Sequence, residues 1–236
     1  MKKILLIVFL FAGSLTGFAQ VSNDVPPVSF GIKAGVNFAN LQQTYAGSSE
    51  AVSSGTLTSF QAGVFADFRF GGISIQPSLL YNGEGATSNI NETVDGFPLS
   101  SNIKLTINYL QLPVYALYHI PVNHNDFYFG LGPFLSYGIN GTEKGSVGIV
   151  IPSGANNATT ENEPVNQKVK FGSDSTSDVK RIDYGATAMA GFKFSNGFLL
   201  SAFYDMGLAN IAANDYTGDD AKVKTRVLGI SVGYSF

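Results

Sequence analysis

The stretch that decides the fold is Thr225–Phe236, which reads T-R-V-L-G-I-S-V-G-Y-S-F. From Leu228 onward a hydrophobic side chain occupies every second position, and small or polar residues lie between. A period of two is that of a β-strand, because successive side chains point to opposite faces. The stretch ends on an aromatic residue, which gains little in water at a frayed terminus. We therefore expect a transmembrane strand whose Val232, Tyr234 and Phe236 face lipid and which closes a barrel on its first strand.

The opposite end of the sequence predicts a secretory signal peptide. Two lysines precede an apolar run from Ile4 to Ala12, and Gly17 and Ala19 are small residues where a signal peptidase reads. An uncleaved anchor is the weaker interpretation, because the run is too short to span a bilayer. The expected organisation is a signal peptide at 1–19, a short N-terminal segment at 20–27 and an outer-membrane barrel domain at 28–236.

Composition narrows the class of protein. Charged residues make up 13% of the chain, against about 25% in soluble domains. The sequence contains no cysteine, which excludes disulfides, thiolate metal sites and cysteine nucleophiles. The net charge is −3, and the absence of a basic block argues against a nucleic-acid partner.

Alternating segments recur along the chain and predict eight strands, with Pro77 and Pro113 as interrupted positions. Pro77 removes a ladder donor and suggests a bulge there. The predicted strands are Val28–Asn40, Leu57–Phe70, Ile73–Gly83, Ile103–Ile120, Asp126–Ile139, Lys180–Phe194, Phe198–Asn210 and Lys222–Phe236. Long polar connections are expected at Leu41–Thr56, Glu84–Asn102, Asn140–Val179 and Ile211–Ala221, and tight turns at Gly71-Gly72, Pro121–Asn125 and Ser195–Gly197. Strict alternation of long and short connections is typical of an all-β, eight-stranded, antiparallel up-and-down transmembrane β-barrel in the outer membrane.

A soluble eight-stranded barrel is the alternative fold. Its second face would be solvated by charged side chains, whereas here that face holds mostly Gly, Ser, Thr, Asn and Gln. Such a face suits a crowded barrel interior, and the aromatic face suits lipid and its interfaces. The membrane barrel is therefore the favoured fold.

Two motifs resemble a known family. F-G-I-K-A-G-V-N-F-A-N-L at Phe30–Leu41 and Y-L-Q-L-P-V at Tyr109–Val114, together with the signal ending F-A-Q, look like the PorT-like outer-membrane β-barrel proteins of Bacteroidota. The resemblance covers essentially the whole mature chain and implies an eight-stranded outer-membrane barrel, mostly of unassigned function. The family's namesake is associated with protein secretion across the outer membrane, and no matching residue here carries that role over.

Five charged residues fall on the expected inner face. An interior that side chains fill is not an open channel, and buried charges there must pair or be hydrated. A structural salt-bridge network is therefore favoured over an ion pathway. Its expected members are Lys33, Asp67, Arg69, Lys193 and Asp205.

Enzymatic chemistry finds little support in the sequence. The two histidines, His119 and His124, lie at or beside the predicted Pro121–Asn125 turn and are interpreted as solvated turn residues, far from most loop carboxylates. The acidic run Asn214–Asp220 is more consistent with a solvated loop than with a calcium site. Asp174-Ser175-Thr176 is a weak match to a bacterial O-glycosylation sequon. We expect no enzyme activity and no cofactor.

The function predicted from these observations is a structural or interaction role in the outer membrane, exerted through long extracellular loops. The alternatives are a narrow passage or small-ligand binding or transport through the lumen, and an accessory role in protein secretion. Expected partners are outer-membrane lipid, the barrel-assembly machinery acting on the C-terminal strand, and an extracellular or secretory protein. The chain is expected to be a monomer.

Overall fold

A computed structural model describes residues 27–44, 51–94, 97–152, 158–174, 176–213 and 222–236. The described chain is all-β and contains ten strands. The strands are β1 (Val28–Thr44), β2 (Ala51–Ser53), β3 (Leu57–Phe70), β4 (Ile73–Val94), β5 (Phe97–Val122), β6 (Asn125–Pro152), β7 (Ala158–Lys168), β8 (Ile182–Lys193), β9 (Phe198–Gly207) and β10 (Lys222–Ser235). Among the described residues, no helix has the length and hydropathy needed to cross a membrane.

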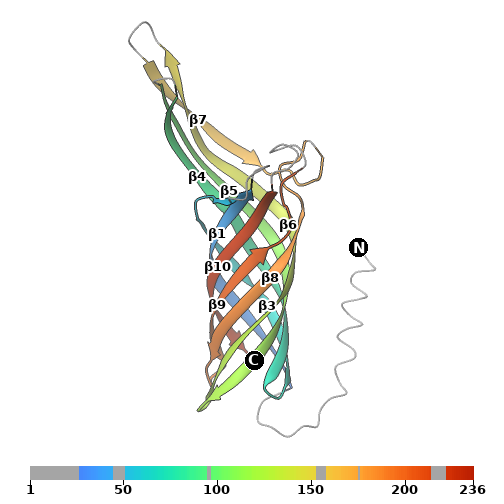
Figure 1. Ribbon diagram of the computed structural model, residues 1–236. Coiled ribbons are helices and arrows are strands. Elements are labelled where there is room, and N and C mark those ends of the chain that lie inside the picture. The colour runs from blue at the N-terminus through green and yellow to red at the C-terminus, as the bar shows by residue number, and fades with distance from the viewer. Residues whose placement is uncertain (1–26, 45–50, 95–96, 153–157, 175, 214–221) are drawn as a thin grey trace.

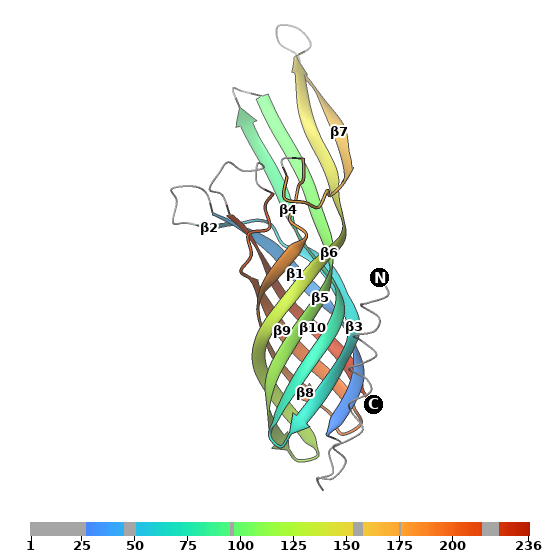
Figure 2. The same cartoon turned by 90° about the vertical axis from the view of Figure 1, so that its right-hand side faces the viewer.

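Eight of these strands form a closed antiparallel ring, which confirms the predicted fold class. The order around the ring is β1, β3, β4, β5, β6, β8, β9 and β10, and β10 pairs again with β1. Figures 1 and 2 show the resulting upright barrel from two sides. The short β2 pairs with β1, and β7 pairs with β6.

The ring closes through the stretch from which the fold was predicted. The register of β1 with β10 runs from Gly31↔Ser235 to Thr44↔Lys222. One further hydrogen bond extends it, from the backbone N–H of Phe236 to the carbonyl of Phe30 at 2.8 Å. The predicted pairing of the last strand with the first is therefore confirmed.

Three tight turns lie at one end of the barrel, which we call the turn end; the opposite end is the loop end. Gly71 and Gly197 have φ values of +65° and +90°, which glycine adopts at little steric cost. The middle turn is shorter than predicted, because β5 continues to Val122 and β6 begins at Asn125. It is made by Asn123 and His124, and Asn123 takes a φ of 57°, as Asn tolerates in hairpin turns.

The predicted long loops are largely wrong, because strands fill most of them. Glu84–Asn102 belongs to β4 and β5, which pair as far as Val94↔Phe97. Much of Asn140–Val179 belongs to β6 and β7, and β1 and β2 occupy part of Leu41–Thr56. These extensions are rich in Ser, Thr and Asn and lack the apolar alternation of a lipid-facing strand, so the period-two signal fades while the backbone pairing continues.

The extensions form a sheet that projects beyond the ring at the loop end. This projecting sheet consists of Thr87–Val94 of β4, Phe97–Lys104 of β5, Lys144–Pro152 of β6 and the whole of β7. Figures 1 and 2 show it leaning away from the top of the barrel.

The proline positions interrupt pairing, and the bulge predicted at Pro77 is not present. Phe65↔Ser78 and Phe68↔Ile75 keep one register across the gap next to Pro77, and the β5–β6 register is likewise unchanged across the gap next to Pro113. The register shift lies between Asn108 and Tyr109. A prolyl nitrogen therefore removes one ladder donor here but inserts no extra residue.

The two faces of the strands lie as the alternation predicts. Val232 and Phe236 expose 56% and 72% of their surface on the outside. Inside, glycines alternate with large aromatic residues because the two kinds compete for the same space. A Cβ on Gly31 would meet the Phe65 ring, and one on Gly229 would meet the Phe203 ring, both at 2.2 Å.

Substitutions in β10 should separate the two faces. Val232→Arg places a cation in lipid, which costs about 2–4 kcal/mol near the midplane. Phe236→Asp costs about 0–1 kcal/mol near an interface but removes the terminal aromatic next to the closing pair, so it should lower the folded yield. Ser235→Asp should be tolerated best, since Ser235 Oγ lies inside and accepts a hydrogen bond from Lys193 Nζ at 3.1 Å.

The measurement is the heat-modifiable folded fraction on gels, followed by urea unfolding of the folded material. Ser235→Asp emerging as the most damaging of the three variants would show that the inner and outer faces of β10 are reversed.

Candidate functional site at the loop end of the barrel

The barrel interior contains two apolar layers that side chains fill. The first, in the turn-end half, is built around Phe65, Tyr115, Leu117, Tyr128 and Phe203. The second, in the loop-end half, contains Ile107, Tyr109, Val179, Ile211, Ala212 and Val223 among others. Ile107 and Tyr109 have no exposed surface. An interior packed in this way is not an open channel.

A polar network lies between the two layers, at the level of Gln111 on β5. Asn37 Nδ2 donates to Asn82 Oδ1 at 2.6 Å, and Asn82 Nδ2 donates to Gln111 Oε1 at 3.0 Å. Gln111 Nε2 in turn donates to Asp205 Oδ2 at 2.9 Å. Thr187 completes the chain by donating to the other oxygen of Asp205. The network links five strands of the ring, β1, β4, β5, β8 and β9, through side chains that are each almost fully buried.

Two of the five predicted charges lie at this level. Lys33 is buried with its Nζ 5.2 Å from the centre of the Tyr115 ring, a cation–π contact. Asp205 is the acid that the network holds, and it interacts with Lys33 electrostatically. These two residues therefore belong to one buried group of opposite charges.

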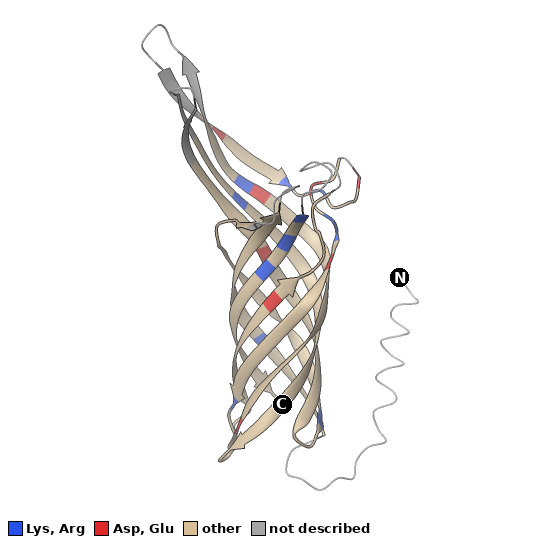
Figure 3. Cartoon of the chain, in the orientation of Figure 1, with Lys and Arg blue, Asp and Glu red and all other residues tan. Residues whose placement is uncertain are grey.

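The other three predicted charges lie at the turn end, away from the first two. Arg69 Nη1 pairs with Asp126 Oδ2 at 2.7 Å, a partner that the sequence analysis did not select. Lys193 donates to Ser235, and Asp67 is buried close enough to Lys193 to interact with it electrostatically. The five residues thus form two groups rather than one network. Figure 3 shows charged residues near the turn end and others nearer the loop end.

Sequence reasoning missed the buried acids Glu84 and Asp183. Glu84 is 1% exposed and accepts a hydrogen bond from Asn82 Nδ2 at 3.0 Å. Asp183 has no exposed surface and accepts from Thr225 Oγ1 at 2.6 Å. The available signal was the polar inner face of β4, which continues through Asn82 to Glu84, one residue beyond the predicted end of that strand.

His119 is not the solvated turn residue that we predicted. It is 5% exposed, and its Nε2 and Nδ1 lie 2.8 Å from Ser74 Oγ and 2.9 Å from Asp126 Oδ2. Only His124 occupies the turn, where it is exposed. The alternation within β5 already places His119 on the inner face, because it lies between the outward-facing Tyr118 and Ile120.

Ser74, His119 and Asp126 have the connectivity of a hydrolytic triad, but their setting is that of a structural network. Ser74 has no exposed surface, so a substrate carbonyl has no route to its Oγ. Asp126 also forms an ion pair with Arg69, which links the three residues to the turn end of the barrel. We therefore assign Ser74, His119 and Asp126 a structural role, in which they hold the strands together at the turn end.

A pocket of about 720 Å³ opens at the loop end, above the second apolar layer. Its floor is apolar and includes Leu41, Leu105, Ile211 and Val223. Its upper wall carries hydroxyl and amide side chains from β4, β5 and the segment after β2, among them Ser54, Thr87, Ser88, Asn89 and Ser101. An apolar floor with a few polar groups above it is the usual construction of a small-molecule site.

Two chain segments hold the floor of this loop-end pocket in place. Lys180 N–H donates to the Ile211 carbonyl at 2.8 Å, and Ile211 N–H donates to the Val223 carbonyl at 2.9 Å. Val179 forms isolated β-bridges with both Ala212 and Phe171. The segments that follow β7 and β9 thus fold over the ring and seal it. Among the described residues, no group of three or more His, Asp or Glu side chains could hold a metal ion; the run Asn214–Asp220 lies outside the described residues.

Comparison with known proteins gives a family match. The profile of the family described as outer membrane protein beta-barrel domain matches residues 18–213. No similar sequence was found among curated proteins.

Solved structures of other small barrels show weaker similarity. The outer membrane protein OprG from Pseudomonas aeruginosa is 15% identical with a TM-score of 0.45, covering 88% of this chain and 95% of its own. Neisserial surface protein A is 14% identical with a TM-score of 0.40, covering 89% and 100%. Ail of Yersinia pestis, solved with the heparin analogue sucrose octasulfate, is 14% identical with a TM-score of 0.38, covering 89% and 100%.

Asn82→Ala should destabilise the barrel through the polar network. The change leaves Asn37, Gln111 and Glu84 each without one partner, which costs about 1–3 kcal/mol for a buried group. Ser78→Ala is the matched control on the same strand face, because Ser78 Oγ is buried without a hydrogen-bond partner among the described residues. Urea unfolding in micelles measures both. Equal losses of unfolding free energy would show that the network contributes nothing.

A fluorophosphonate probe, which labels activated serines, should not label the folded barrel, because Ser74 is enclosed. The probe is added to folded protein in micelles and read by gel fluorescence, with a soluble serine hydrolase as positive control. Labelling that Ser74→Ala abolishes would overturn the structural assignment of Ser74, His119 and Asp126.

Proposed function

The chain belongs to the outer membrane protein beta-barrel domain family, and from this premise we propose that it is an interaction protein of the outer membrane rather than a wide porin or an enzyme. The observation that carries the proposal is the projecting sheet, which extends β4, β5 and β6 beyond the ring and adds β7. A barrel needs no such extension to span a bilayer. The extension therefore serves something outside the membrane.

The edge of the projecting sheet suits binding of a protein partner. Among the described strands, β7 pairs only with β6, so its other edge presents backbone donors and acceptors. Unpaired edges bind extended peptides by strand addition. Asn162, Glu163, Asn166 and Gln167 are exposed along this edge strand, which gives it polar character and suits a partner met in water.

The loop-end pocket supports a second candidate function, the binding of a small amphipathic ligand. The two apolar layers beneath it argue against passage of that ligand through the barrel, since Tyr109 and Leu117 fill the path as fully buried side chains. Binding at the mouth and display of the projecting sheet are compatible, because both face the same end.

Finer assignments follow the sequence motifs. We propose membership of the PorT-like barrels of Bacteroidota, supported by Phe30–Leu41 and Tyr109–Val114, with an accessory role in protein secretion as one form of the interaction. Removal of a signal peptide at 1–19, assembly through the C-terminal strand by the barrel-assembly machinery, and a monomeric state are parts of the same proposal. The loop end is proposed to face the cell exterior.

The interaction role is tested with a shortened barrel. Residues 89–102 and 143–167 are each replaced by Asn-Gly, a strong hairpin turn, which rejoins the cross-strand pairs Ser88↔Ile103 and Thr142↔Lys168. All eight strands of the ring remain. After crosslinking on whole cells, quantitative mass spectrometry should recover a partner at least about tenfold more with the intact barrel, by loss of a strand-addition surface.

Two controls accompany this comparison. Both proteins must show the heat-modifiable folded band, and protease added to whole cells must cut the intact barrel within Asn140–Val179 while sparing Ser195–Gly197. Identical recoveries from the two barrels would exclude the projecting sheet as the interaction surface. Steady unitary currents from the intact barrel in planar bilayers would favour the narrow-passage alternative instead.

A further inference from the structure

Outward-facing cations line the loop end of β10, where the lipid-facing band of that strand stops. Towards the loop end from Leu228, which exposes 54% of its surface, the next outward positions are Arg226, Lys224 and Lys222. Figure 3 shows this basic ladder as consecutive blue segments on the strand. Three cations therefore follow directly after the apolar surface, in a chain whose net charge is −3.

The neighbouring strand adds polar side chains at the same level. Asn40 of β1 pairs with Arg226, and Gln42 pairs with Lys224. These β1 residues are half-buried on the outward face. Amide groups between cations can donate to phosphate oxygens, so the two strands together present a surface suited to an anion.

Carboxylates do not neutralise the basic ladder from the described part of the chain. No acidic oxygen among the described residues lies within 4.0 Å of the three cations. Asp183 acts on Arg226 electrostatically from inside the barrel, beyond ion-pair distance, and it is engaged by Thr225. The buried acids thus point inward while the cations point to the membrane.

The guanidinium of Arg226 is held in place by the barrel wall. Its Nη1 donates to the carbonyls of Gly207 and Thr225, both at 2.7 Å. Both of these hydrogen bonds use one nitrogen, so Nε and Nη2 keep donors that can form a two-point contact with a phosphate. Such a fixed fork loses little entropy on binding.

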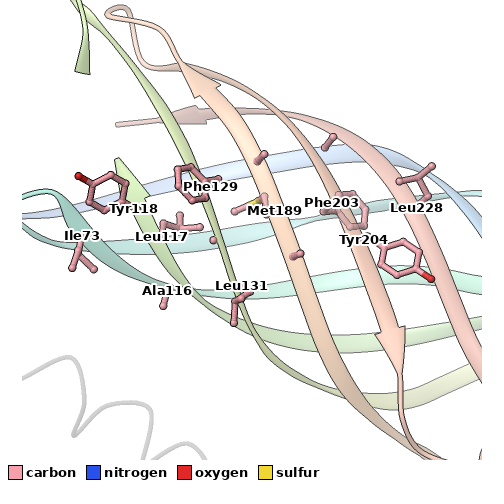
Figure 4. Close-up of a pocket in the computed structure, with 14 residues that line it drawn as sticks. Ile73, Ala116, Leu117, Tyr118, Phe129, Leu131, Met189, Phe203, Tyr204 and Leu228 are labelled. Atoms are coloured by element: carbon pink, nitrogen blue, oxygen red, sulfur yellow. The ribbon is translucent and has the colours of Figure 1, made fainter. Parts of the chain in front are cut away.

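An apolar groove of about 680 Å³ begins beside the basic ladder and runs across the strands. It extends from Leu228 on β10 past Tyr204 and Leu131 to Ile73 on β4, as Figure 4 shows. Its floor is recessed because small side chains such as Ala188 and Ala190 lie between these larger ones. The groove has the apolar character needed to hold an acyl chain.

We propose that Lys224, Arg226 and this groove form a binding site for one phosphorylated lipid of the surrounding leaflet. The phosphate lies on the basic ladder, since cations near a membrane surface attract anionic headgroups, and an acyl chain enters the groove at Leu228. Charge complementarity selects a lipid over a helix of a neighbouring protein, since the cations sit at headgroup level. The orientation proposed above determines only which leaflet supplies the lipid.

The site is tested by native mass spectrometry of the folded barrel released from nanodiscs that contain lipid A, a phosphorylated glycolipid, in phosphatidylcholine. The double variant K224Q/R226Q should retain lipid A about tenfold less than the unchanged barrel. K104Q/K144Q is the matched control, because Lys104 and Lys144 form an exposed cross-strand pair of cations on the projecting sheet. Lys222 is left unchanged in these variants, because it is the cation of the basic ladder nearest in sequence to the acidic residues Asp219 and Asp220, which lie outside the described residues.

Further arms separate the parts of the proposal. The unchanged barrel should retain dephosphorylated lipid A about as poorly as K224Q/R226Q retains lipid A. Millimolar inorganic phosphate should not displace the lipid. A188F should lower lipid retention by filling the groove. Equal retention by K224Q/R226Q and the unchanged barrel, equal losses in both double variants, or displacement by inorganic phosphate would overturn the proposal. If K224Q/R226Q gives no folded band, the single variant K224Q is compared with the unchanged barrel instead. Because nanodiscs hold lipid A in both leaflets, these results are independent of the interaction role.

Discussion

Every part of this structure depends on the pairing of β10 with β1. A bilayer offers no water to an unpaired backbone N–H or C=O, so a sheet can span it only as a closed ring. The pairing runs over fourteen consecutive residue pairs, from Gly31↔Ser235 to Thr44↔Lys222. Closure in turn fixes the two faces of every strand, because each side chain must point either to lipid or to a narrow interior.

The narrow interior explains the inner-face composition. Large rings such as Phe65 and Phe203 fit only because the facing positions Gly31 and Gly229 have no Cβ. Polar side chains are tolerated at the same depth only as a connected network, since a buried polar group without a partner is costly. Asn82 connects three other side chains of that network, and the apolar layers on either side close the path through the barrel.

In the loop-end half of the barrel, acidic and basic side chains lie on opposite faces. Acids such as Glu84 and Asp205 are buried inside, whereas the cations of the loop-end half of β10 point outward. The sorting has a physical cause, because an inward acid can be satisfied by amides and hydroxyls, while a long cationic side chain reaches a lipid headgroup from the edge of the apolar band. A chain with a negative net charge thereby presents a basic rim to the membrane.

The sequence by itself determined the lipid-facing strands, the three turns and the closure on Phe236, because a strand between lipid and a packed interior must alternate strictly. It placed Lys33 and Asp205 on the inner face for the same reason. It did not determine the projecting sheet, whose two faces meet no lipid and so leave no alternation to read. Nor did it determine partners: that Arg69 pairs with Asp126, or that Ser74 lies against His119, depends on the register between strands distant in sequence. Only the closed tertiary structure sets that register.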